Sequence, residues 1–329
     1  MVWLVFIISS ALLVFAATKL AQFGDAIAMR TGLGRLFVGT LLLAGATSLP
    51  ELLTSINSLS QGVPDLAAGN FMGSNMFNMF LLGVLDLVGR QARILRRVAM
   101  RHALTAGLAI LLSGLAVFFI LAGVKIRIGW IGLDSLLIGA TYIVGLRLIH
   151  ANNPAAVEAP AEAVNLDGVP ALYQALIGFG AAAALLVVVS PWLVSSSKEI
   201  ATITGLGAGF VGTALVGVVT SLPEVATSIA ALQIGAYDMA VGNLFGSNAF
   251  NMFALTLTDA FYLQGHFFEV IAPEFALVGL LALVLTSLGL IGNLARLDRR
   301  LGFVEADSLV IMIGYIIGLT FLYARGIGV

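Results

Sequence analysis

The chain has 329 residues, of which 60% are hydrophobic and only 10% are charged, and its mean hydropathy is +1.06. This composition excludes a soluble globular protein, and apolar stretches of about 20 residues recur along the whole length, each long enough to cross a bilayer. The formal net charge of −1 says nothing about partners, and no nucleic-acid partner is expected for a chain of this class. The lack of cysteine excludes disulfides, thiolate metal ligands and thiol nucleophiles.

We predict an all-α polytopic membrane protein with ten transmembrane helices. The expected spans are 2–24, 34–60, 64–88, 98–123, 128–149, 169–195, 207–233, 237–262, 270–293 and 306–324. The longest polar connection, 150–168, separates five spans from five. We therefore divide the chain into a first five-helix repeat (1–149), a linker (150–168) and a second five-helix repeat (169–329).

The distribution of basic residues predicts the orientation. With the N-terminus outside, twelve of the 16 Lys and Arg residues fall in or beside cytoplasmic loops, and the other four lie outside: Lys125, Arg127, Lys198 and Arg325. Because cytoplasmic loops carry an excess of Lys and Arg, both termini are expected outside the cell membrane and the 150–168 linker in the cytoplasm.

A stretch of the sequence repeats at a spacing of 173 residues. Residues 32–82 align with 205–255 without a gap, and 30 of these 51 positions are identical. The matches include Pro, Glu, Asn and Ser, which a shared apolar bias would not align. These two segments are therefore the cores of the two halves.

The two halves are expected to be inverted with respect to each other. Each has five predicted spans, an odd number, so the second half enters the membrane in the opposite sense. Inverted repeats related by a pseudo-two-fold axis in the membrane plane are typical of secondary transporters. Such an axis would bring equivalent motifs together at mid-depth.

The repeated motif Thr-Ser-Leu-Pro-Glu places a carboxylate inside an apolar span, at 47–51 and at 220–224. An acidic group at the centre of a membrane helix costs about 2.5–3.5 kcal/mol on the insertion scale, so a functional role is the default interpretation. The proline cannot donate a backbone hydrogen bond and clashes with the preceding turn. We therefore predict that the helix opens near Ala46 and Thr47 and leaves carbonyl oxygens free.

The next span of each repeat carries a second polar motif. Gly69 and Gly73 are expected to loosen the third span, so that helices 2, 3, 7 and 8 are all broken around a central ion site. Ser74 and Asn78 share one helix face and can point at Glu51. The second repeat supplies equivalent residues at identical spacing: Thr220, Ser221, Glu224, Ser247 and Asn251.

These residue types favour a hard cation. Together the motifs offer two carboxylates, two amide oxygens, several hydroxyls and the carbonyls freed by the prolines. Calcium takes six to eight oxygen ligands at about 2.3–2.6 Å, and two carboxylates would balance its charge. The segments contain neither Cys nor His, which argues against zinc or copper at this site.

The other polar residues have structural interpretations. Asp65 and Asp238 resemble helix N-caps near the surface. Asp86 and Asp259, which pair under the same shift of 173, lie toward span ends and are interpreted as solvated. The three histidines lie at predicted span boundaries and are not expected to relay protons. Four asparagines are interpreted as partners of the broken backbone rather than of an ion: Asn70, Asn75, Asn243 and Asn248.

The paired Thr-Ser-Leu-Pro-Glu and Gly-Asn-x-x-Gly-Ser-Asn-x-x-Asn segments resemble the α-repeats of the cation/Ca2+ exchanger superfamily, and most of all its prokaryotic sodium/calcium exchangers. The resemblance implies ten helices with ion sites in mid-membrane. It implies calcium held by Glu51 and Glu224 with the carbonyls of Thr47 and Thr220. It places sodium at overlapping sites that involve Ser48, Ser74, Asn78, Ser221, Ser247 and Asn251.

One departure from the superfamily pattern affects the ion count. Some relatives have Asp where this chain has Asn78 or Asn251. With Asn at both positions the site has only two carboxylates, so the number of sodium ions stays open.

The expected activity is antiport of Ca2+ for Na+ by alternating access, with no cofactor, no enzymatic chemistry and a monomer sufficient for transport. The first and sixth spans, outside the repeated core, are candidates to slide across it, as the resemblance suggests. The nearest alternative is Ca2+/H+ antiport at the same site, and a passive cation channel is more remote. A hydrolase using Ser48 or Ser221 is disfavoured because neither motif supplies an activating base.

Overall fold

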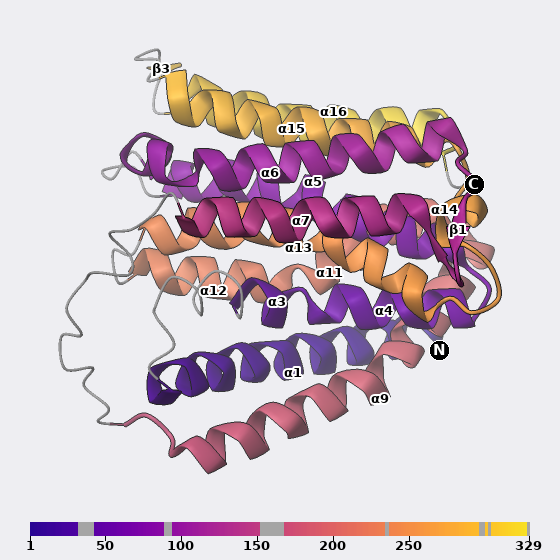
Figure 1. The fold of residues 1–329 in the computed structure, drawn as a ribbon, viewed down its shortest axis with the longest axis horizontal. Coiled ribbons are helices and arrows are strands. Elements are labelled where there is room, and N and C mark those ends of the chain that lie inside the picture. Colours follow the sequence, from indigo (N-terminus) through magenta and orange to yellow (C-terminus); the bar gives the residue numbers. More distant parts are fainter. Residues whose placement is uncertain are drawn as a thin grey trace.

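The computed structural model describes residues 1–31, 43–88, 94–151, 168–233, 237–295, 300–301 and 304–327, and these form a bundle of helices that run along one common direction (Figure 1). The first half contains α1 (Val2–Thr31), α3 (Leu43–Thr47), α4 (Leu49–Ser60), α5 (Pro64–Val88), α6 (Ile94–Ala122) and α7 (Leu133–Ala151). The second half contains α9 (Leu172–Thr204), α10 (Ala208–Val211), the π-helix η2 (Gly212–Val216), α11 (Gly217–Thr220), α12 (Leu222–Gln233), α13 (Tyr237–Phe261), α14 (Phe267–Val270), α15 (Phe275–Ala295) and α16 (Ala306–Ala324).

One short antiparallel hairpin precedes the last helix of each half. Strands β1 (Arg127–Ile128) and β2 (Ile131–Gly132) lead into α7, and β3 (Arg300–Leu301) and β4 (Val304–Glu305) lead into α16. The two hairpins lie at opposite ends of the bundle, with β1 on the right and β3 on the left of Figure 1. Equivalent elements at opposite ends are what an inverted repeat requires.

The 173-residue repeat extends well beyond the region of high identity. Under this shift the bounds of α4 coincide with those of α12, α5 with α13, and α7 with α16. The hairpin strands also coincide, and α1 and α9 end at equivalent residues, Thr31 and Thr204. The inverted-repeat prediction is therefore confirmed for elements whose sequences have diverged.

Eight helical segments among the described residues are long and apolar enough to cross a membrane. The predicted second and eighth spans, α3–α4 and α13, fall outside that set, so the count of ten stays a prediction. Residues 152–167, which make up most of the predicted linker, lie outside the described residues. The chain termini lie at the same end of the bundle, as an even number of crossings requires (Figure 1).

The prediction that the third and eighth spans are broken is wrong. Both α5 and α13 are continuous helices of 25 residues. The glycines of α5 instead allow close packing, because a Cβ on Gly69 or Gly73 would collide with the backbone oxygens of Gly209 or Thr213. Small residues at helix interfaces let backbones approach closely in membranes. The irregular backbone lies in the facing segment, where η2 interrupts the seventh span.

Helices α1 and α9 form a pair along one side of the bundle, at the bottom of Figure 1. Their buried residues form an apolar cluster distinct from the main core, and Ala46 of α3, Leu66 of α5, Val211 of α10 and Val216 of η2 also belong to it. Gly178 of α9 leaves space for the ring of Phe23, and Phe179 packs near Gly24. These are the first and sixth predicted spans, and they contact each other more extensively than they contact the core helices.

We predict that Gly73→Ala destabilises the protein. The added methyl group would meet the backbone of Thr213, which cannot move aside as a side chain can. Overpacking of this kind costs about 1–3 kcal/mol, so the melting temperature in detergent should fall. Gly180→Ala is the matched control, since a methyl group added there would meet nothing within 4 Å. Equal melting temperatures for the two variants would contradict this packing role.

Candidate functional site

The acidic motif breaks the helix once in each repeat. The break lies at Ser48, between α3 and α4, and at Ser221, between α11 and α12. The two serines have nearly the same backbone angles, φ −90° and ψ 5° for Ser48, φ −86° and ψ 2° for Ser221. Each break lies two residues before a proline that has no N–H to donate to the preceding turn. The opening predicted near Ala46 and Thr47 is thus found at the next residue.

The breaks place the two glutamates at the start of α4 and α12, where each is fully buried. Oε1 of Glu51 accepts hydrogen bonds from Ser74 at 3.4 Å and from Ser221 at 3.3 Å. Oε1 of Glu224 accepts from Ser247 at 3.2 Å and from Ser48 at 3.3 Å. Each carboxylate is therefore held by one serine of its own repeat and one of the other.

The second oxygen of each carboxylate has no hydrogen-bond partner among the residues that the structure describes. Oε2 of Glu51 and Oε2 of Glu224 are buried and unpartnered, and so are the amide oxygens of Asn78 and Asn251. Buried polar atoms without a partner are rare in folded proteins and call for an explanation such as an ion. These four oxygens come from four of the ten residues that the sequence places at the predicted ion site.

A symmetric asparagine network orients the two amides. Asn75 and Asn248 each donate to the other's backbone oxygen, at 3.3 and 3.2 Å. Their side-chain oxygens accept from Asn251 and Asn78, each at 3.0 Å. Because the amide nitrogens of Asn78 and Asn251 are used in this way, their oxygens point elsewhere. Asn75 and Asn248 are thus partners of backbone and side chains, in line with the interpretation from sequence.

The two halves differ in the hydrogen bonds of Asn70 and of its repeat equivalent, Asn243. Thr220 Oγ1 donates to Asn70 Oδ1 at 2.9 Å, and Asn70 Nδ2 donates to the backbone oxygen of Glu51 at 3.1 Å. In the other half the equivalent Asn243 donates to Thr227 Oγ1 at 2.9 Å, and its own Oδ1 has no partner. The repeats are therefore not in identical conformations.

The structure brings all ten predicted site residues together in one buried region. None of their side chains is exposed: Thr47, Ser48, Glu51, Ser74, Asn78, Thr220, Ser221, Glu224, Ser247 and Asn251. Thr47 Oγ1 lies 3.5 Å from Ser247 Oγ, and Ser74 Oγ lies 3.3 Å from Thr220 Oγ1. These contacts link the two repeats again, so the region belongs to both halves of the chain.

The interpretation of two acidic residues as solvated is wrong. Asp86 and Asp259 are 6% and 0% exposed. Asp86 accepts a hydrogen bond from Ser308 at 2.6 Å, and Asp259 accepts two from backbone N–H groups. The sequence did not predict this burial, because both residues lie near span ends and these hydrogen-bond partners are either far away in the chain or backbone N–H groups. Asp65, expected as an N-cap, accepts instead from the backbone N–H of Ala272 at 3.0 Å.

Inverted helical halves that meet at a buried pair of carboxylates and unwound backbone define a polytopic membrane transporter. Comparison with known proteins agrees with this class. The profile described as "Sodium/calcium exchanger protein" matches residues 1–149 and 174–324, so the chain belongs to that family.

Individual relatives agree with the family assignment. The chain is 28% identical to the "Putative antiporter CaxA" of Alkalimonas amylolytica over 321 residues, 94% of this chain and 95% of CaxA. It is 30% identical to the "Inner membrane protein YrbG" of Escherichia coli K12 over 251 residues, 75% of each chain. A solved structure of the sodium-calcium exchanger NCX_Mj superposes with a TM-score of 0.62 at 22% identity, covering 98% of this chain and 100% of that one. This last similarity shows the shared fold.

We predict that Asn248→Ala destabilises the protein strongly. The change removes the partner of Asn78 Nδ2 and of the Asn75 backbone oxygen, and each group left unsatisfied in a buried position costs about 1–3 kcal/mol. The melting temperature in detergent measures the loss. Asn57→Ala is the control, because the Asn57 amide bonds only to Leu53 of its own helix. A melting temperature for Asn248→Ala as high as that of Asn57→Ala would show that the asparagine network does not stabilise the fold.

Proposed function

We propose that the protein exchanges Ca2+ for Na+ across the membrane by alternating access, with both ions bound between Glu51 and Glu224. The observation that carries the proposal is the set of four buried oxygens without partners, two from carboxylates and two from amides. Membership of the sodium/calcium exchanger family supports the choice of ions. The site has only oxygen donors, which suits hard cations.

The charge of the site suits a divalent cation. Two carboxylates buried close together repel each other and are costly to leave without a counter-ion. One Ca2+ would neutralise both. Its ligands would be the unpartnered oxygens, with the serine hydroxyls and the carbonyls of Thr47 and Thr220 completing a shell of six to eight.

Sodium would occupy the same region in the other half of the cycle. The serine hydroxyls that bond to the carboxylates, together with Asn78 and Asn251, could form several smaller groups of oxygen ligands. Each group would bind one Na+, and the bound Na+ ions together would balance the charge of the two carboxylates. Because the sites overlap, Na+ and Ca2+ would compete rather than bind together. This competition is what couples the two fluxes.

Coupling further requires that the empty site does not change sides. Two bare carboxylates are expensive to carry through a dry barrier, so only an ion-loaded site would move readily. We assign the movement to the α1–α9 pair, because these two helices pack against each other more extensively than against the rest of the bundle. The unequal hydrogen bonding of Asn70 and Asn243 is in keeping with halves that adopt different conformations in turn.

The remaining parts of the proposal concern the cell. We place the protein in the cell membrane with both termini outside, on the basis of the basic residues, and the linker 150–168 in the cytoplasm. A single chain contributes both halves of the site, so a monomer would suffice for transport.

Proton exchange at the same site is the competing function. Two buried glutamates with one free oxygen each could accept protons in place of sodium. Vesicles loaded with Ca2+ at clamped pH and exposed to a Na+ gradient distinguish the two. Ca2+ efflux that follows the Na+ gradient supports the proposal, whereas efflux that ignores Na+ and follows pH would replace it with Ca2+/H+ antiport.

We predict that Glu51→Gln and Glu224→Gln each abolish Ca2+ exchange while the protein still folds in membranes. Each change removes half of the charge that balances Ca2+ and leaves the hydrogen bonds of the serines largely in place. Uptake of radioactive Ca2+ into vesicles measures the effect, with Na+ and proton gradients applied separately. Glu199→Gln, on the exposed surface of α9, serves as the control. Near-normal exchange by either site variant would rule out the assignment.

We predict that Asn78→Ala weakens Ca2+ binding without abolishing exchange. The change removes one neutral oxygen ligand and keeps both carboxylates. A hydrogen-bond-like contact to a charged group contributes about 1.5–3 kcal/mol, so the Ca2+ concentration for half-maximal exchange should rise roughly tenfold or more. Asn57→Ala is again the control. An unchanged Ca2+ dependence would exclude Asn78 from the shell.

A further inference from the structure

A second cluster of ionisable side chains is buried at the end of the bundle where the β1–β2 hairpin and α14 lie (Figure 1). Asp134 is in the first turn of α7, Asp259 is near the end of α13, and His266 immediately precedes α14. None of the three side chains is exposed. The proposed Ca2+/Na+ mechanism uses none of them.

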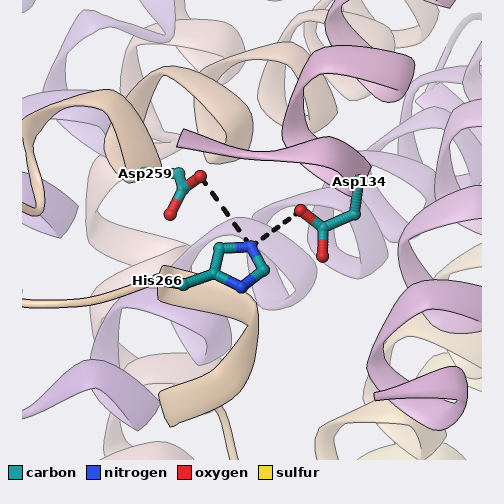
Figure 2. Close-up of side chains that lie close together, drawn as sticks. All are labelled: Asp134, Asp259 and His266. Atoms are coloured by element: carbon teal, nitrogen blue, oxygen red, sulfur yellow. Dashed lines mark hydrogen bonds and ion pairs between the residues drawn. The ribbon is translucent and has the colours of Figure 1, made fainter. Parts of the chain in front are cut away.

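The two carboxylates converge on one nitrogen of the His266 imidazole. His266 Nε2 lies 2.7 Å from Asp134 Oδ1 and 3.9 Å from Asp259 Oδ2, and Figure 2 shows both carboxylates facing the same edge of the imidazole ring. One ligand atom from each residue can be chosen so that all three lie within 4.8 Å of one another. Gly132 makes this approach possible, because a Cβ at that position would collide with His266 Nε2.

Part of the cluster has an evident structural role. Asp259 accepts hydrogen bonds from the backbone N–H groups of Gly132 at 2.9 Å and Phe267 at 2.6 Å, so it joins the hairpin to α14. Asp134 Oδ1 also accepts from the N–H of Ser135 at 2.6 Å. Such a brace needs neither a histidine nor a second carboxylate.

Three polar atoms of the cluster are buried without a partner: Asp134 Oδ2, Ser135 Oγ and His266 Nδ1. With neutral imidazole the cluster carries two negative charges in a dry environment, which is unfavourable without compensation. Burial lowers the pKa of His266, but the hydrogen bond and charge of Asp134, with the charges of Asp259 and Glu269, raise it above the usual value overall. A proton on the ring balances only one of the two charges.

The other half of the molecule lacks such a cluster among its described residues. Under the 173-residue shift Asp134 corresponds to Asp307, Asp259 to Asp86 and Ser135 to Ser308, so both carboxylates recur in the other half. There the carboxylate and the hydroxyl bond directly to each other at 2.6 Å. The position equivalent to His266 is Arg93, which lies outside the described residues. The repeat therefore keeps the two carboxylates and the serine but not the histidine, so a nitrogen ligand that could bind a metal is particular to this half.

We propose that Asp134, Asp259 and His266 form a binding site for a borderline divalent metal ion such as Zn2+, separate from the central ion site. One imidazole nitrogen and two carboxylates are a ligand set that zinc accepts, and Ser135 or water can supply the fourth position. Calcium fits poorly, since it takes six to eight oxygens. A Zn2+ ion neutralises both carboxylates.

The geometry needs only small adjustments. Ligands at about 2.0–2.2 Å from a tetrahedral ion lie roughly 3.3–3.6 Å apart. The contact between His266 and Asp134 would lengthen as the metal replaces the shared proton, and Asp259 would move closer. Residues near the cluster in the sequence lie at the surface of the protein, since Ile128 and Trp130 of the hairpin and Leu263 of the loop before α14 are more than half exposed.

The test is titration of the purified full-length protein with Zn2+, followed by calorimetry and by the melting temperature. The wild type should bind one Zn2+ at this cluster and melt at a higher temperature. His266→Gln keeps an N–H donor for Asp134 and loses the metal ligand, so Zn2+ affinity should fall at least tenfold. Asp134→Asn should show the same loss and covers the case in which His266→Gln fails to fold.

Two further variants control for other binding sites. Asp86→Asn removes the repeat-related carboxylate and should leave Zn2+ binding unchanged. Glu224→Gln impairs the central site and should also keep it, so this result is independent of the exchange function. The proposal is overturned if the wild type does not bind Zn2+, if His266→Gln and Asp134→Asn bind it as tightly as the wild type does, or if Glu224→Gln alone abolishes binding.

Discussion

The structure depends on how two buried carboxylates are held beside each other in an apolar protein. One oxygen of each carboxylate accepts hydrogen bonds from serine hydroxyls of both repeats, and the other oxygen has no partner among the described residues. Two negative charges in a medium of low dielectric constant repel strongly, so this arrangement is stable only when cations or protons compensate them. Under the proposed mechanism, the same constraint would keep an unloaded site from crossing the membrane.

The repeat determines the geometry of this pair, because the same short motif occurs once in each half. One Ser at each helix break bonds to the glutamate of the opposite repeat, so neither half forms the site alone. The pairing of Asn75 with Asn248 fixes the relative position of α5 and α13, on which the four remaining serine and asparagine ligand candidates lie. Glycines of α5 bring its backbone against η2, where the helix is already irregular. Gly212 of η2 and Gly217 of α11 contribute to the same close contact, because a Cβ on either would meet the backbone of α5.

Much of this could be predicted from the sequence, because gapless identity of Pro, Glu, Asn and Ser at one spacing fixes both the repeat and its meeting point. The positions of the breaks followed from Pro50 and Pro223. The continuity of α5 and α13 could not be predicted in this way. Gly69 is compatible with either a broken helix or a close contact, and only the position of the facing backbone distinguishes the two. Burial of Asp259 was not predicted either, because its partners are backbone N–H groups, one in the distant β1–β2 hairpin and one at the start of α14, and backbone partners leave no pattern in the sequence.

The most direct test of the central claim is diffraction from crystals soaked in Ca2+ or in Sr2+ as its heavier substitute, with the ion located by its anomalous scattering. We expect a peak between Glu51 and Glu224, within coordination distance of Oε2 of both and of the amide oxygens of Asn78 and Asn251. A peak elsewhere in the protein, with these four oxygens still unpartnered under saturating Ca2+, would contradict the claim.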